Sequence, residues 1–238
     1  MANILSEIRK KIGLYNLKNA FKKISDKIAG LPSSLPPNQL LDIAYSKDFS
    51  LIEPWQERTE IVEVLNILEK NPPKSVLEIG TANGGTLFLL TRMASKNASI
   101  LSVDLPGGKF GGGYPEWKEP IYKSFAKKGQ TVNLIRANSH DKETHSRVAS
   151  FFKDKKVDFI FIDGDHTYEG VKQDFENYKE FLTDGALVMF HDIAAHPNPI
   201  YGVDKFWKEI KQEFEHKEFV KDWFDCGRGL GLLFYKKK

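Results

Sequence analysis

Two strand-like stretches of this chain each end in a group of ionisable side chains. The stretch Val157–Ile162, in which five of six residues are apolar, is followed at once by Asp163–His166, which places two carboxylates and an imidazole within four positions. A second apolar run, Ala186–Phe190, is followed by His191–Asp192. If the two runs are neighbouring parallel strands, their carboxyl ends bring these side chains to one edge of a sheet, where ligands of open α/β folds bind.

The chemistry open to this group is metal binding and proton transfer. Asp163, His191 and Asp192 offer two carboxylates and one imidazole, a set that suits Mg²⁺ or a transition metal ion. Each residue also has an ordinary structural role. His191 could donate to a backbone carbonyl, His166 could cap the next helix, and we interpret Asp165 as a loop or capping residue. Burying so many ionisable groups without a function would be costly, which favours a site.

A third feature is the glycine-rich turn Glu78–Gly85, followed by a strand that ends in Asp104. Glycines let the backbone approach a ligand, and the helix that follows presents free amides. The glycine spacing departs from the G-x-G-x-x-G fingerprint of dinucleotide sites, and a carboxylate at Glu78 suits a cationic ligand better than a pyrophosphate. Asp104 stands where an acidic residue accepts hydrogen bonds from ribose hydroxyls; its structural alternative is a turn or cap residue.

The elements that would position these residues alternate between strands and helices, which predicts a mostly parallel sheet covered on both faces. The expected strands are Ser75–Ile79, Ile100–Val103, Val132–Arg136, Val157–Ile162 and Ala186–Phe190. Helices are expected at 55–70, 85–95, 120–128, 142–152, 168–182 and 202–214. The segments 218–226 and 230–236 suggest two last strands joined by a Gly-Arg-Gly turn.

Three motifs, "EIGTANGG", "SVD" and "FIFIDGDH", together resemble those of class I S-adenosylmethionine-dependent methyltransferases over roughly residues 56–235. The resemblance implies a Rossmann-like, seven-stranded α/β sheet, mostly parallel with an antiparallel C-terminal strand, helices on both faces and an N-terminal helical extension. It implies S-adenosylmethionine as cofactor. The residues that would surround it are Glu78, Gly80, Thr81, Gly84, Asp104, Asn138, Ser139, His140 and Asp163.

The chain is more closely similar to a subgroup of metal-dependent O-methyltransferases that includes macrolide-sugar enzymes and the proteins called cephalosporin hydroxylases. Their D-x-x-H motif matches Asp163-Gly164-Asp165-His166, which implies that Asp163 binds metal and His166 acts as general base. The next strand of the subgroup commonly ends in two acidic residues, where this chain has His191 and Asp192. We therefore expect methyl transfer to a hydroxyl of a small molecule or glycan sugar, with Asp163, His191 and Asp192 as the metal site.

The first 28 residues form a basic segment with seven basic and two acidic side chains, a net charge of +5 against +3 for the whole chain. Its apolar residues recur at near-helical spacing. We expect a helix that packs on the body or on a second subunit, so a homo-oligomer is open, and peripheral membrane contact is the less favoured alternative. The Pro- and Ser-rich stretch 31–39 suggests a linker, so we divide the chain into an extension (1–50) and a methyltransferase domain (51–238).

Composition limits the location and the other functions of the chain. A single cysteine, no apolar run of membrane-spanning length and no signal-like apolar core predict a cytoplasmic protein. Outside the basic segment the net charge is −2, so we expect no nucleic-acid partner, and a nucleic-acid methyltransferase is disfavoured. A cofactor-binding protein without catalysis and a nicotinamide dehydrogenase remain open at this point, the second against the glycine spacing.

Overall fold

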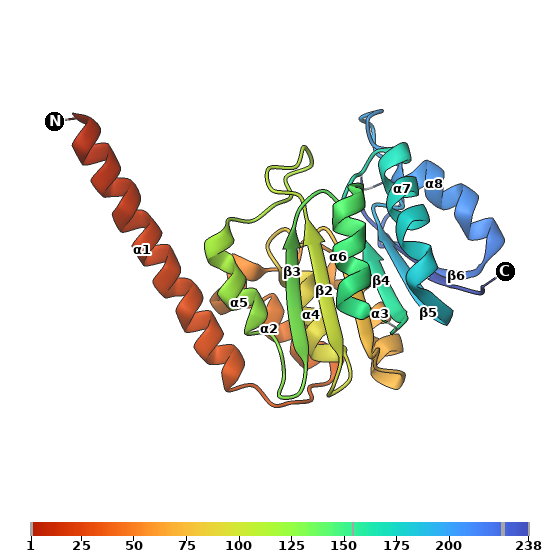
Figure 1. Cartoon of the computed structure of the whole chain (residues 1–238), viewed down its shortest axis with the longest axis horizontal. Helices are drawn as coiled ribbons and strands as arrows, with labels where there is room; N and C mark the ends of the chain where they lie inside the picture. Colours follow the sequence, from red (N-terminus) through yellow and green to blue (C-terminus); the bar gives the residue numbers. More distant parts are fainter. Residues whose placement is uncertain (1, 154, 225–226, 238) are drawn as a thin grey trace.

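A seven-stranded sheet forms the centre of the protein in the computed structural model, which describes residues 2–153, 155–224 and 227–237, with only the backbone for 2–11 (Figure 1). The strands are β1 (Ser75–Ile79), β2 (Ser99–Asp104), β3 (Thr131–Arg136), β4 (Val157–Ile162), β5 (Leu182–His191), β6 (Glu215–Phe219) and β7 (Leu230–Phe234). Their order is β3-β2-β1-β4-β5-β7-β6, and the neighbours are parallel except where β7 lies antiparallel between β5 and β6. The predicted fold class is confirmed.

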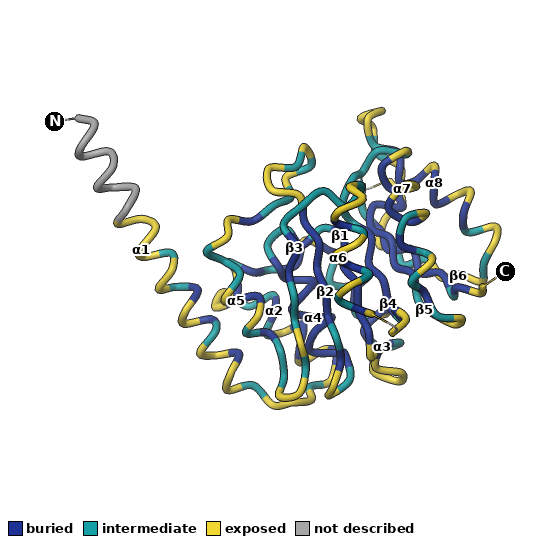
Figure 2. Tube along the Cα trace, in the orientation of Figure 1, coloured by how far each residue is buried: buried dark blue, intermediate teal, exposed yellow. Residues whose placement is uncertain are grey.

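Helices cover both faces of the sheet. They are α1 (Ala2–Ala29), α2 (Pro37–Ala44), α3 (Arg58–Lys70), α4 (Gly85–Met93), α5 (Glu119–Lys123), α6 (Lys142–Phe152), α7 (Tyr168–Tyr178) and α8 (Val203–Ile210), with short 3₁₀ turns between them. One apolar core joins the sheet to α2, α3, α4 and α5, and a second joins it to α6, α7 and α8. The central strands β1 and β4 are buried at almost every residue (Figure 2), which explains why they are apolar on both faces.

Three parts of the chain differ from the sequence-based expectation. The helix expected at 120–128 is shorter, because α5 ends at Lys123. The sixth strand lies at Glu215–Phe219 rather than at 218–226; residues 220–224 are not in a strand, and 225–226 lie outside the described residues. The stretch 31–39 does not separate two bodies completely, because α2 begins at Pro37 and buries Leu40 and Leu41 in the core shared with α3 and α4.

The helix α1 lies partly against the body and partly away from it. Its C-terminal half buries Phe21, Ile24 and Ile28, while its N-terminal half projects beyond the sheet (Figure 1). Within the residues that the structure describes, none of the helices is both long enough and apolar enough to cross a bilayer.

Candidate active site

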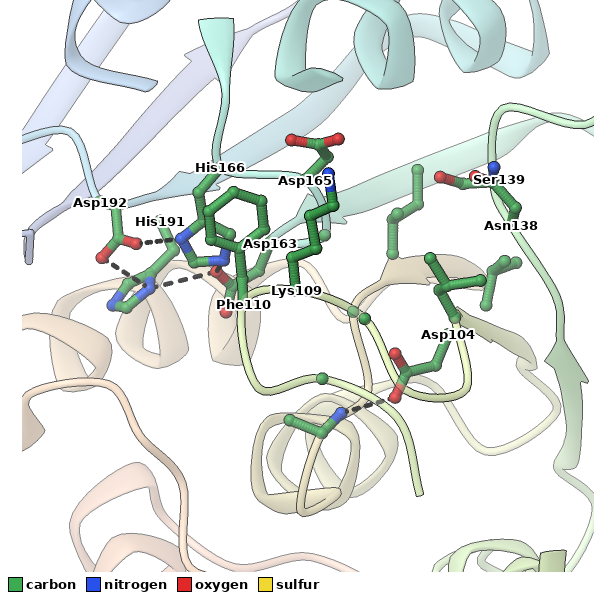
Figure 3. A pocket seen from close by; sticks show the side chains of 18 of the residues that line it. Asp104, Lys109, Phe110, Asn138, Ser139, Asp163, Asp165, His166, His191 and Asp192 are labelled. Atoms are coloured by element: carbon green, nitrogen blue, oxygen red, sulfur yellow. Dashed lines mark hydrogen bonds and ion pairs between the residues drawn. The ribbon is translucent and has the colours of Figure 1, made fainter. Parts of the chain in front are cut away.

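The carboxyl ends of the parallel strands surround a cavity of about 400 Å³. Its wall is made by the segments that follow β1, β2, β3, β4 and β5, together with Trp55 from the segment before α3 and Gly227 from the connection between β6 and β7. This is the edge at which the sequence placed its candidate residues, and the cavity is the place where ligands of such sheets bind. Figure 3 shows the side chains that line it.

At one end of the cavity, two carboxylates and two imidazoles from β4 and β5 meet. His191 Nδ1 lies 3.2 Å from Asp163 Oδ1 and 3.1 Å from Asp192 Oδ1. His166 Nδ1 lies 2.6 Å from Asp192 Oδ2, and its Nε2 lies 3.6 Å from Asp163 Oδ1 (Figure 3). The structure therefore brings these four predicted residues together, and it makes His166 part of the cluster. The cap of α7 is Thr167, whose hydroxyl accepts from the Gly170 amide.

The charges of this cluster depend on one another. Burial alone would lower the pKa of His191, but the charges of Asp163 and Asp192 outweigh it and raise this pKa to about 9. Burial would also lower the pKa of His166. The hydrogen bond to Asp192, the largest effect in the other direction, and the nearby carboxylates outweigh burial, so this pKa is raised as well. Burial would raise the pKa of Asp192, yet the neighbouring histidines lower it. The histidines beside Asp192 therefore favour the ionised form of this carboxylate.

The donor set also fits a divalent metal ion. One ligand atom each from Asp163, His191 and Asp192 lie within 4.8 Å of one another. His191 Nε2 is buried and has no hydrogen-bond partner among the described residues, and Asp192 holds a left-handed backbone conformation with φ 61°. Such strain is kept where surrounding structure requires it, and often at functional sites. Two carboxylates with an imidazole suit a transition metal ion better than Mg²⁺, which prefers oxygen ligands.

A residue that the sequence analysis missed, Gln56, fixes the orientation of Asp163. Its Nε2 donates to Asp163 Oδ2 at 3.1 Å, and its Oε1 accepts from the hydroxyl of Thr86 in the first turn of α4. Gly85 lets this segment come close, because a Cβ there would lie 2.3 Å from the Pro54 nitrogen. A buried glutamine before a helix has no local sequence pattern, so only the fold reveals its partner.

The glycine-rich turn after β1 lies at the middle of the cavity. Gly80 lines the cavity, whereas the N-cap residue Gly84 has φ +83° and faces the ring of Tyr122. Glu78 is fully buried beneath the turn, where it accepts from Ser102 Oγ, which in turn contacts Thr81 Oγ1 at 2.6 Å. Burial raises the pKa of Glu78 well above its usual range. Glu78 and Thr81 thus support the turn from behind rather than lining the main cavity.

Asp104, at the end of β2, points into the opposite end of the cavity from the histidines (Figure 3). Its Oδ2 accepts from the amide of Ala82 at 3.0 Å, and both oxygens lie 3.1 Å from the amide of Gly113. Burial raises its pKa to about 6 despite these amides. Backbone amides thus fix the orientation of this carboxylate at the carboxyl end of β2.

The segment after β3 also lines the cavity and is anchored from behind by α7. Asn138, Ser139 and His140 are all in the cavity wall. Ser139 Oγ donates to Oδ1 of the fully buried Asp174 at 2.6 Å, and His140 Nε2 lies 3.2 Å from the same oxygen. The hydrogen bond between His140 and Asp174 raises the pKa of His140. Asp174 is a second residue that the sequence analysis missed, because it lies mid-helix and far along the chain.

Aromatic rings from two loops cover the histidine end of the cavity. Phe110, in the glycine-rich segment after β2, stacks on His166 with 4.9 Å between ring centroids and 18° between planes (Figure 3). Tyr201, after β5, meets both rings edge-on and stacks on His196 at 3.9 Å. The loops that follow β2 and β5 therefore meet above the predicted general base.

Comparison with known proteins gives the class of this chain. A family model described as a methyltransferase domain matches residues 77–193. Uncharacterized protein R132 of Acanthamoeba polyphaga mimivirus is 30% identical over 184 residues, covering 71% of this chain and 77% of that protein. Uncharacterized protein y4gI of Sinorhizobium fredii (strain NBRC 101917 / NGR234) is 28% identical over 170 residues, or 70% of this chain, and the match spans 18% of its length. The chain belongs to the class I S-adenosylmethionine-dependent methyltransferases.

Solved structures share the fold at low sequence identity. The O-methyltransferase from Bacillus cereus, in complex with SAH, superimposes with a TM-score of 0.57 at 15% identity, covering 90% of this chain and 97% of that one. The O-methyltransferase TomG from Streptomyces achromogenes, involved in tomaymycin synthesis and solved with SAM, gives a TM-score of 0.55 at 13% identity, covering 85% and 90%. At these identities the similarity establishes the fold.

Proposed function

We propose that this protein transfers the methyl group of S-adenosylmethionine to a hydroxyl of a small molecule or glycan sugar, with His166 as general base and a divalent metal ion assisting. The observation that carries the proposal is the set of residues that line one cavity. Asp104 lies at one end, the cluster of Asp163, His166, His191 and Asp192 lies at the other, and Gly80 lines the wall between them. The solved O-methyltransferases that share this fold support the same kind of acceptor.

The cofactor would extend across the cavity from Asp104 toward the histidine cluster. Asp104 would accept hydrogen bonds from the ribose hydroxyls, and the segment 138–140, anchored by Asp174, would surround the adenine. The N-terminal amides of α4 and the turn at Gly80 would take the amino-acid end of the cofactor. The sulfonium methyl would then point toward His166.

His166 would act as the base. Its Nδ1 contacts Asp192 Oδ2, which leaves Nε2 to take a proton. In the reaction, the acceptor oxygen bonds to the methyl carbon as the bond from carbon to sulfur breaks and the hydroxyl proton passes to Nε2. S-adenosylhomocysteine then leaves without the sulfonium charge. Phe110 and Tyr201 would hold a ring-shaped acceptor in line with the methyl group, and positioning of this kind supplies much of the rate.

A divalent ion would be held by Asp163, His191 and Asp192. Bound there, it would lower the pKa of the acceptor hydroxyl and so assist its deprotonation at neutral pH. Gln56 keeps Asp163 Oδ1 turned toward the two histidines. His191 is then the feature that separates this site from one made only of oxygen ligands.

Calorimetric titration tests the cofactor and the metal separately. S-adenosylmethionine should bind the wild-type protein, and Asp104→Ala should abolish binding. Mn²⁺ should bind the wild-type protein and fail to bind Asp163→Asn. The matched control is Asp165→Asn, which removes a carboxylate from the same cavity but outside the cluster and should leave Mn²⁺ binding unchanged.

Each result has a distinct meaning. Cofactor binding without metal binding would leave His166 as the only proton acceptor and would refute the metal-assisted reaction. Equal loss of Mn²⁺ binding in both Asp variants would refute the assignment of the ligands. Absence of S-adenosylmethionine binding would refute the cofactor site itself. Tight cofactor binding without turnover on any hydroxylated acceptor would favour a cofactor-binding protein without catalysis.

A further inference from the structure

The segment Leu105–Gly113, which follows β2, forms one wall of the cavity. The residues that it contributes to the wall are Leu105, Gly108, Lys109, Phe110 and Gly112. It begins directly after Asp104 and reaches His166, where the ring of Phe110 lies on the imidazole with 4.9 Å between the centroids (Figure 3). The segment therefore extends from the end of the cavity assigned to the ribose to the end that holds the histidines.

The base of this segment is fixed at Asp104. The amide of Gly113 lies 3.1 Å from both oxygens of that carboxylate. A Cβ on Gly113 would lie 2.6 Å from the nitrogen of Gly107 and 2.7 Å from the oxygen of Leu105, so the two ends of the segment are packed against each other. Compact loops whose ends lie this close together are frequently functional.

The tip of the segment is bonded mainly to itself. In the part of the chain that the structure describes, residues 106–112 make backbone hydrogen bonds only within the segment, from Gly108 to Leu105 O at 3.2 Å and from Gly111 to Gly108 O at 3.3 Å. Gly107 and Gly111 have φ +73° and +84°, and there is open space where a Cβ would stand on either of them. The backbone of the tip is therefore free to move.

The side chain of Phe110 attaches this tip to the body. Its ring stacks on His166 with 18° between the planes and meets Tyr201 edge-on at 5.3 Å. Both partners are fixed in place. His166 Nδ1 lies 2.6 Å from Asp192 Oδ2, and the carbonyl of His166 accepts at 2.9 Å from the amide of Gly202, the residue after Tyr201. Phe110 is therefore the member of this group that can leave.

We propose that Leu105–Gly113 is a lid over the cofactor site and that the stacking of Phe110 on His166 is its latch. The proposal rests on the cofactor site assigned above and adds the route by which the cofactor enters and leaves. With the latch formed, the tip closes the cavity between Asp104 and His166. When the latch breaks, the tip moves away while Gly113 stays bonded to Asp104.

A lid of this kind has a kinetic signature. The cofactor passes only while the lid is open, so both its entry and its exit are slowed by the fraction of time for which the lid is closed. A change that weakens the latch equally with and without the cofactor raises both rate constants by one factor. It leaves the dissociation constant unchanged, because it does not favour either the free or the bound state.

Stopped-flow binding of S-adenosylhomocysteine tests the lid, with tryptophan fluorescence as the signal because Trp55 lines the cavity. In Phe110→Ala the rate constants for entry and exit should both rise by about 2- to 12-fold, which is the contribution of one stacked aromatic pair. The dissociation constant should stay within about twofold of that of the wild-type protein. Phe110→Tyr keeps the ring and should show the rates of the wild-type protein.

Gly111→Ala weakens the closed lid from outside the cavity. Gly111 is not part of the cavity wall, and an alanine there meets no other atom but must hold the left-handed conformation while the lid is closed. Both rate constants should rise by about 5- to 30-fold, with the dissociation constant unchanged. The matched control is Gly185→Ala in β5, which has φ +81° and the same open space but lies outside the lid, and it should change neither rate.

A measurement without ligand separates the lid from the cofactor site. Diethyl pyrocarbonate, followed by mass spectrometry, should modify His166 about 5- to 30-fold faster in Gly111→Ala than in the wild-type protein or in Gly185→Ala, because Phe110 leaves the imidazole more often. If this increase is seen but the wild-type protein does not bind S-adenosylhomocysteine, the cofactor site is refuted and the latch stands.

Two results would overturn the lid. The first is S-adenosylhomocysteine binding with wild-type rate constants in both Phe110→Ala and Gly111→Ala. The second is a faster exit with an unchanged entry rate in Phe110→Ala, and hence a raised dissociation constant, which would make Phe110 a direct contact of the ligand instead of a latch.

Discussion

Gly80 allows the ends of β1 and β4 to approach each other, and replacing it with alanine should damage the fold and the site together. The residue has φ +96°, and a Cβ placed on it would lie 2.1 Å from the carbonyl oxygen of Asp163 and 2.6 Å from the carbonyl carbon. Both atoms belong to the backbone, and the Asp163 amide is itself bonded to Ile79 O at 2.8 Å. The strand end cannot move without displacing Asp163.

Gly185 provides a matched control for this substitution. It has φ +81°, is exposed, and has open space where its Cβ would stand. Alanine at either position must adopt the left-handed conformation, which costs about 1–2 kcal/mol. At both positions alanine also lowers the conformational entropy of the unfolded chain to the same extent. Only Gly80→Ala adds overpacking, which costs about 1–3 kcal/mol. The free energy of unfolding should therefore fall by about 1–3 kcal/mol more for Gly80→Ala than for Gly185→Ala.

Urea unfolding of the two variants measures this difference. The slope with denaturant should be the same for both, so the midpoints report the difference in stability directly. Binding of S-adenosylhomocysteine should be lost in Gly80→Ala and kept in Gly185→Ala, because only the first displaces the cavity wall. Equal midpoints, or full ligand binding by Gly80→Ala, would refute the argument that the close approach of β1 and β4 requires a glycine here.

Four further experiments address single residues of the cavity. Gln56→Met keeps the size of the side chain but removes the hydrogen-bond donor to Asp163. In calorimetry, the affinity for Mn²⁺ should therefore fall by about tenfold or more, while the affinity for S-adenosylhomocysteine stays the same. An Mn²⁺ affinity equal to that of the wild-type protein would contradict this role of Gln56. Because the pKa of Asp104 is raised to about 6 and ribose hydroxyls bind the ionised form, affinity for S-adenosylhomocysteine should rise about tenfold from pH 5 to 7 and level off above that; Asp104→Asn should remove the rise. Asp174→Ala releases Ser139 and His140, and should lower the unfolding free energy by about 1–3 kcal/mol and weaken ligand binding, whereas an unaltered ligand affinity would place adenine elsewhere. Phe110→Ala uncovers the ring of His166, whose modification by diethyl pyrocarbonate, followed by mass spectrometry, should become faster; an unchanged rate would mean that the stacked ring does not shield it.

Much of the fold could be predicted because its strands are buried on both faces. Five of the six residues of Val157–Ile162 are apolar and buried for that reason, and its predicted bounds are those observed. The sixth strand was predicted wrongly because it pairs only with β7, at the edge of the sheet. Residues 215–217 are exposed and polar, so they carry no strand-like apolar pattern, while the apolar side chains just beyond them suggested a strand that is not there.

The same contrast holds for the cavity. Asp163, His191 and Asp192 could be brought together in advance because parallel strands end at one edge, so position along each strand determines proximity. Gln56 and Asp174 could not, because each reaches the cavity through tertiary packing. Gln56 lies 107 residues from Asp163 in sequence, and Asp174 lies 35 residues from Ser139. Neither stands in a motif that local spacing could have shown.

Because of Gln56, the functional unit begins before the region that the family model matches. The family match starts at residue 77, and everything between β1 and the end of β5 lies inside it. Yet Gln56 holds Asp163, and Trp55 lines the cavity. The segment that carries them is held against α4 at Gly85, where any side chain would force it away. A protein cut back to the matched region would keep every proposed metal ligand and lose the residue that orients one of them. Its metal site should therefore be weaker than that of the full chain, even if the sheet still folds.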